Sequence, residues 1–138
     1  MKRNVKLLVV PILLLAAVGV AQVKNSSGRI KDALPAGINL SDAKVVEIKD
    51  DGGNVVLSGT FSNFAAPLVS KGAVAKAKGL AEIEIEKSGA ATKQEIEVAV
   101  ENLPALSTFR LIVDGNEVAT FTTSKSGKRA LKYTRKDH

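Results

Sequence analysis

The sequence predicts an all-β domain, an antiparallel sandwich of about seven strands, and two observations carry this prediction. The first is period-two alternation, in which apolar residues occupy every second position of a segment. The clearest example is residues 82–86, EIEIE. The second is regular spacing, because Gly- and Asn-rich turns separate the segments and no long amphipathic helix interrupts them. A small barrel is the alternative architecture.

The strands are expected in order, each for its alternation or its β-branched and aromatic content. They are expected over residues 45–49, 55–61, 77–87, 93–101, 109–113, 117–123 and 128–135. Turn residues at 50–54, 88–92 and 114–116 predict three hairpins. Residues 62–75 are expected to connect two sheets, since Pro67 and Gly72 interrupt them. The last strand is expected at a sheet edge, with Leu131 and Tyr133 facing inward and its charges limiting aggregation.

The amino-terminal residues have the layout of an export signal. A basic segment, residues 1–6, precedes an apolar run over residues 7–21 that ends in small residues at Gly19 and Ala21. We predict a signal peptide over 1–21, cleaved after Ala21, then a flexible segment over 22–42 with one docked turn near 34–40. The β-sandwich domain is predicted over 43–138. A retained membrane anchor is the alternative, although fifteen apolar residues are short for a span.

The composition excludes several chemistries. The chain has no cysteine, and its one histidine, His138, is the last residue. Thiol catalysis, cysteine-bound metals and a Ser-His-Asp triad are therefore excluded, and we expect neither an enzyme nor a cofactor. The formal charge is +6, of which the predicted signal peptide contributes three basic residues, so the mature chain carries about +3.

Glutamates gather on one face of the predicted 82–97 hairpin. A register that places the isoleucines and valines together also gathers Glu82, Glu84, Glu95 and Glu97, which are candidate ligands for a divalent cation. The competing interpretation is a solvated face, with Arg110 reaching Glu97 or Glu101 in exposed ion pairs.

Basic residues crowd the carboxy-terminal segment. They are Lys125, Lys128, Arg129, Lys132, Arg135 and Lys136, candidates for binding an anionic polymer. The competing interpretation is a charged edge strand and tail. Nucleic acid is not expected as a partner, because a nucleic-acid face usually adds stacking aromatics and only Tyr133 is available.

Parts of the chain resemble a known type of domain. The runs LSGTF, AKGLAEIEIEKSGAATKQEIEVAVENLPALSTFRLIVDG and VATFTTSKSGKRALKY are similar to an immunoglobulin-like β-sandwich domain of exported bacterial proteins of unknown function. The first part is also faintly similar to the CHRD domain, a secreted β module, over about half the chain. The histidine-bearing segment of that module would follow Leu103 and is missing here. Neither resemblance implies a catalytic function.

These observations together predict a non-catalytic, exported binding or structural domain, located in the periplasm or outside the cell. The expected partner is a protein or an anionic polymer of the cell envelope. Contact with the membrane is expected only through the signal peptide before cleavage. The alternative is a calcium- or ligand-responsive module that uses the glutamate-rich face.

Overall fold

The structure, a computed structural model, describes residues 4–7 and 29–138. Apart from a short 3-10 helix, η1 (Leu40–Asp42), its regular structure is all strand, so the all-β prediction is confirmed. The strands are β1 (Asn4–Leu7), β2 (Arg29–Ala33), β3 (Val45–Asp50), β4 (Val55–Thr60), β5 (Ala65–Ser70), β6 (Lys78–Ser88), β7 (Ala91–Glu101), β8 (Thr108–Val113), β9 (Asn116–Thr122) and β10 (Arg129–Asp137).

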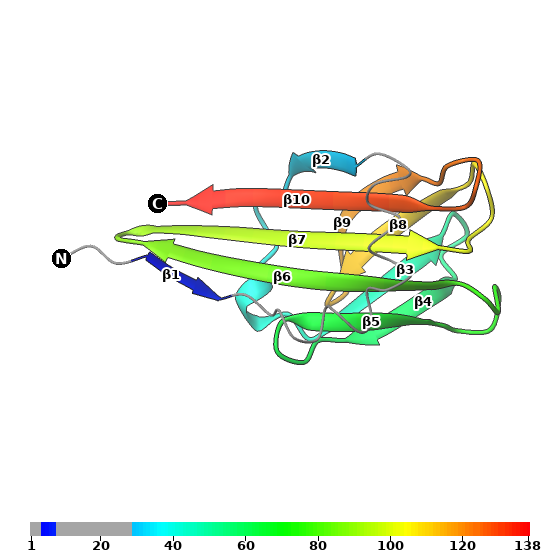
Figure 1. The fold of residues 1–138 in the computed structure, drawn as a ribbon, viewed down its shortest axis with the longest axis horizontal. Coiled ribbons are helices and arrows are strands. Elements are labelled where there is room, and N and C mark those ends of the chain that lie inside the picture. The colour runs from blue at the N-terminus through cyan, green and yellow to red at the C-terminus, as the bar shows by residue number, and fades with distance from the viewer. Residues whose placement is uncertain (1–3, 8–28) are drawn as a thin grey trace.

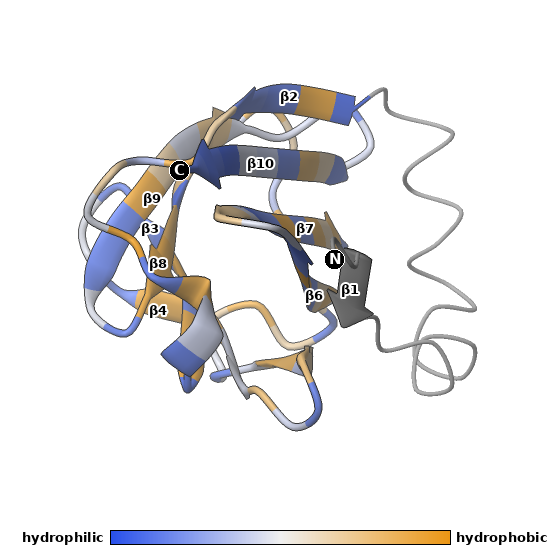
Figure 2. Cartoon of the chain, turned by 90° about the vertical axis from the view of Figure 1, so that its left-hand side faces the viewer, coloured by the Kyte–Doolittle hydropathy of each residue, from blue (hydrophilic) through white to orange (hydrophobic). Residues whose placement is uncertain are grey.

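Hydrogen bonds join these strands along one path, β2-β10-β7-β6-β5-β4-β3-β8-β9, and β1 also pairs with β6 (Figure 1). All neighbours are antiparallel except β2 and β10, which are parallel. The sheet curls, so that β6, β7 and β10 lie across the interior from β3, β4 and β8 (Figure 2). The link between these halves is short, because β4 and β5 pair only through Leu57–Ser70 and Ser58–Val69.

The alternating segments face the way their sequence predicts. Ile83, Ile85, Ile96 and Val98 are all buried in a core shared by both halves of the sheet. Burying one such side chain stabilises the fold by about 1.5–3 kcal/mol, so the alternation fixes which face of β6 and β7 turns inward. The three predicted hairpins form as β3–β4, β6–β7 and β8–β9.

The segment predicted to be flexible differs from that expectation over residues 29–42. Here β2 pairs with β10, and Leu34, Ile38 and Leu40 are buried, so the predicted docked turn is present. As a consequence β10 lies between β7 and β2, and the prediction of an edge strand over 128–135 was wrong. Five residues in which only Ile30 and Ala33 are apolar give no period of two, so the sequence could not reveal this long-range parallel pairing.

Residues 65–70 form the strand β5, although the sequence predicts a connection there. Pro67 has no N–H to donate and normally argues against a strand inside a sheet. It is tolerated because the β4–β5 pairing includes only residues 57–58 and 69–70. Gly59 allows the close approach, since a Cβ there would overlap the carbonyl oxygen of Pro67.

Most of the predicted signal peptide, residues 1–3 and 8–21, lies outside the described residues. Its residues 4–7 form β1, which pairs with β6 in the register Leu7–Ile85. In the described part of the chain, no helix has the length and apolar character needed to cross a membrane.

Candidate functional site

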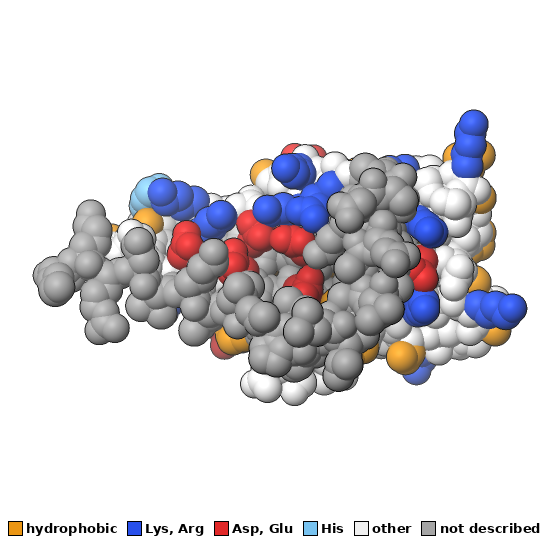
Figure 3. Space-filling model, in the orientation of Figure 1, with side chains coloured by type: hydrophobic (Ala, Val, Ile, Leu, Met, Phe, Trp, Pro, Cys, Tyr) orange, Lys and Arg blue, Asp and Glu red, His pale blue; other side chains and the backbone are white. Residues whose placement is uncertain are grey.

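The predicted glutamate face exists on the outer surface of β6 and β7. The register places Glu82 directly opposite Glu97 and Glu84 directly opposite Glu95. Like charges in directly opposed positions repel each other. Figure 3 shows the compensation, since carboxylates and basic side chains lie side by side on this face.

Basic residues of β7 itself, of β10 and of β2 supply this compensation. Lys132 on β10 lies 3.5 Å from Glu95, and Lys93 lies 3.7 Å from the same carboxylate. Arg29 on β2 lies 3.7 Å from Glu97. Glu95 is only 5% exposed, so water and salt screen its ion pairs less than they screen ordinary surface pairs. The glutamate face is therefore an internally paired surface.

Arg110 does not form the ion pair expected of it. It lies 3.9 Å from Asp51 and 3.9 Å from Glu117, and the prediction that it reaches Glu97 or Glu101 was wrong. The reason is topological, because β8 lies between β3 and β9, on the other half of the sheet from β7.

A divalent cation would need several of these carboxylates to converge on one point. Calcium takes six to eight oxygen ligands. Over residues 4–7 and 29–138, no three histidine, cysteine, aspartate or glutamate side chains converge in a way that could hold a metal.

The basic residues of the carboxy-terminal segment do not form one continuous row. Lys125 and Lys128 lie in the loop between β9 and β10. Arg129 begins β10, and its Nε donates a 2.8 Å hydrogen bond to the carbonyl of Thr122 at the end of β9. Lys132 and Lys136 lie on the outer face, opposite Glu97 and Lys93 respectively.

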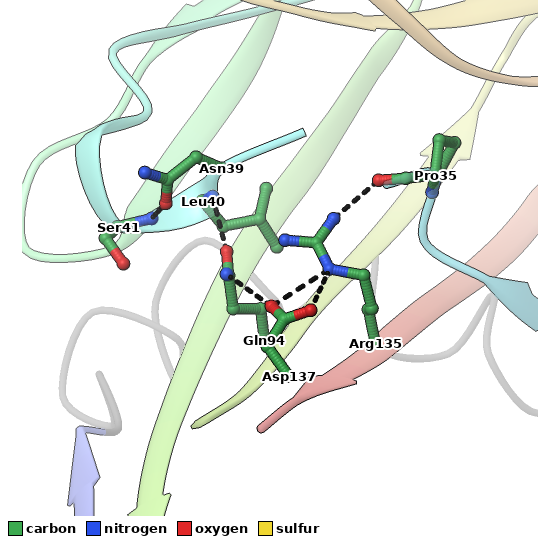
Figure 4. Close-up of polar contacts among 7 residues, drawn as sticks. All are labelled: Pro35, Asn39, Leu40, Ser41, Gln94, Arg135 and Asp137. Carbon is green, nitrogen blue, oxygen red and sulfur yellow. Dashed lines mark hydrogen bonds and ion pairs between the residues drawn. The ribbon is translucent and has the colours of Figure 1, made fainter. Parts of the chain in front are cut away.

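Arg135 belongs to a separate polar network at the inner face of the β6–β7 hairpin (Figure 4). Its Nε donates to Asp137 at 2.9 Å, and its guanidinium also donates to the carbonyl of Pro35. Gln94 donates to Asp137 at 3.3 Å and accepts a 2.6 Å hydrogen bond from the backbone N–H of Leu40. This network joins the segment after β2 to β7 and β10. The hydrogen bonds of Arg135 therefore stabilise the fold.

The other end of the molecule collects four loops: β3–β4, β5–β6, β7–β8 and β9–β10 (Figure 1). Two of these loops are tightly joined. Thr123 is 0% exposed, and its hydroxyl donates to the carbonyl of Pro104 at 2.6 Å and accepts from the N–H of Ser107 at 3.0 Å. The N–H of Leu103 donates to Gly127 at 3.1 Å, and that of Leu106 donates to Ser124 at 3.2 Å. The β7–β8 loop is therefore held rigidly.

This rigid loop presents Leu106 to solvent. Leu106 is 66% exposed and has a positive φ of 51°, in the left-handed region that non-glycine residues rarely adopt. Loops positioned by a rigid scaffold often carry function, and strained residues cluster at binding sites. Leu106 is the most exposed of the large apolar side chains in the described residues.

A cleft of about 420 Å³ opens beside this loop. Val56, Val74 and Phe109 provide its apolar lining, and Asp50 and Asp51 carry the only charges among the described residues that line it. Hydrogen bonds from the turn, chiefly from the backbone N–H of Asn54, lower the pKa of Asp50. The carboxylate of Asp50 therefore adds a negative charge to the rim of this apolar cleft at neutral pH.

No sequence pattern singles out this site. The sequence predicts a turn over residues 50–54 and a connector over residues 102–106, and both elements are present. The signal that was available is the spacing in Leu103-Pro104-Ala105-Leu106, since two leucines three residues apart in a turn cannot both be buried easily. Only the structure shows that Leu103 is buried and Leu106 is exposed.

Comparison with known proteins adds no assignment to this geometry. No family model matches the chain, and neither a curated protein nor a solved structure does.

Proposed function

We propose that this chain is an exported, non-catalytic domain that binds a partner protein through its loop end. The observation that carries the proposal is Leu106, a large apolar side chain held exposed in a strained conformation by hydrogen bonds to the β9–β10 loop. A preorganised loop loses little conformational entropy on binding, so more of its contact energy appears as affinity.

Export is supported by the sequence. The basic residues before position 7, the apolar run over 7–21 and the small residues Gly19 and Ala21 are the features that signal peptidase substrates share. A non-catalytic role is supported by the lack of cysteine and by a single histidine at the chain end.

The immunoglobulin-like arrangement is part of the same proposal. It is supported by the two facing halves of the curled sheet, by the short pairing that joins them, and by the antiparallel hairpins. In such sandwiches the loops cluster at the two ends, where they are free to vary and to bind.

The test compares partners captured by two matched variants. Leu106→Ser removes the exposed leucine, and Val69→Ser removes the other strongly exposed aliphatic side chain of the described residues, 59% exposed on β5. The wild type and Val69→Ser should retain the same protein from an envelope extract, and Leu106→Ser should lose it. Retention of that protein by Leu106→Ser, with both variants folded, would contradict the proposal. Mass measurement of the exported chain tests cleavage after Ala21.

A further inference from the structure

We propose that the loop-end cleft receives a segment of a partner protein that carries one arginine or lysine beside an apolar side chain. This inference rests on the proposed binding role of the loop end and names the chemistry of its ligand.

The apolar part of the ligand follows from the walls of the cleft. Val56 and Phe109 are buried side chains that form its floor, and Val74 is half-buried on the β5–β6 loop. About 420 Å³ is within the range of cavities that hold small ligands, and exceeds what one side chain requires. Two neighbouring side chains of an extended segment would fill it.

The cationic part follows from the rim. Asp51 is exposed, and its carboxylate has a weak partner, because Arg110 is also exposed and lies 3.9 Å away. Asp50 lies next to it, but its oxygens already accept hydrogen bonds from Gly52 and Asn54. Asp51 is therefore the group that would exchange Arg110 for a charge on the ligand. The long aliphatic stem of arginine or lysine can cover the apolar floor while its head reaches this carboxylate.

The surrounding charge limits the ligand to a single cation. Lys71 and Lys76 are exposed on the β5–β6 loop that forms one wall. Their positive charge, on the loop that carries the lining residues Ala73 and Val74, disfavours a segment with several adjacent basic residues more than a segment with one. The cleft also opens beside Pro104, so that a segment leaving it passes the loop that presents Leu106.

The experiment titrates the purified protein with capped tetrapeptides and follows backbone amide shifts by NMR. The probe has the sequence Ala-Leu-Arg-Ala. The two controls replace its arginine by glutamate or its leucine by serine. We expect the probe to shift amides of residues 50–52, 73–74 and 107–109 with a dissociation constant of about 1 mM, and both controls to bind several-fold more weakly.

Two variants locate the contact. Ala73→Trp should fill the cleft and abolish the shifts, and Asp51→Asn should weaken binding roughly fivefold, while Asp42→Asn, an exposed aspartate on η1, should have no effect. Unchanged thermal midpoints confirm that the variants fold. No shifts at about 10 mM probe, or equal binding of the glutamate peptide, would overturn the inference. If Leu106→Ser still loses the envelope partner in that case, the proposed function stands and only the ligand chemistry fails.

Discussion

The outer face of β6 and β7 and the loop end of the molecule differ in whether their notable side chains are covered by partners. On the outer face, directly opposed glutamates are balanced by Lys93 and Lys132, both within 3.7 Å of Glu95. At the loop end, hydrogen bonds fix the backbone while Leu106 is left without cover.

Under the proposed function, a group of charges that pair with one another is a weaker sign of a binding site than an uncovered apolar side chain on a hydrogen-bonded loop. The charged residues of the outer face stabilise one another. At the loop end, hydrogen bonds hold a backbone arrangement that leaves the Leu106 side chain exposed to solvent. A bound ligand would bury this side chain.

The largest effect should come from the loop end. Gly127 has a positive φ of 76°, and a Cβ there would overlap the carbonyl oxygen of Leu103. Gly127→Ala should therefore lower the free energy of unfolding by about 2–3 kcal/mol, measured by urea denaturation. Gly37→Ala is the control, because a Cβ at Gly37 meets nothing within 4 Å. Equal losses in the two variants would mean that the two loops are not joined as described.

A smaller effect should come from the outer face. Glu95→Gln removes a buried carboxylate that pairs with two lysines, and should lower the free energy of unfolding by about 1 kcal/mol. The loss stays small because both lysines are partly exposed and because the substitution also removes the repulsion between Glu95 and Glu84. Glu117→Gln is the matched control, because its pair with Arg110 is exposed and long. If thermal or urea unfolding gives both variants the wild-type stability, the outer-face pairs do not stabilise the fold.

The smallest effect should be seen at Asp50, and it depends on pH. Hydrogen bonds to the carboxylate lower the pKa of Asp50 from its ordinary value of 3.8. The resulting stability is present above that value and is lost as the pH falls through the lower pKa of the folded state. Asp50→Asn should thus be slightly less stable than Asp51→Asn at pH 7, and the difference should fade below about pH 4. A difference that grows on acidification would contradict this assignment.

Strand prediction succeeded where the signal was local and repeated. Residues 82–86 alternate strictly, and a one-residue slip would expose the isoleucines, so face and hairpin register follow directly. Prediction failed for residues 29–33, where one isoleucine and one alanine among charged residues show no period of two. It also failed for residues 65–70, where Pro67 argued against a strand.

By itself the sequence determined the strand class, the inward face of β6 and β7, and the gathering of the glutamates, because a period of two acts between residues close in the chain. Only the tertiary structure decided that β2 pairs with β10, that Arg135 donates to the carbonyl of Pro35, and that Leu106 stays exposed beside a cleft. These outcomes depend on which segments meet across long stretches of chain. Such meetings are selected by the packing of the whole core, and no local pattern records them.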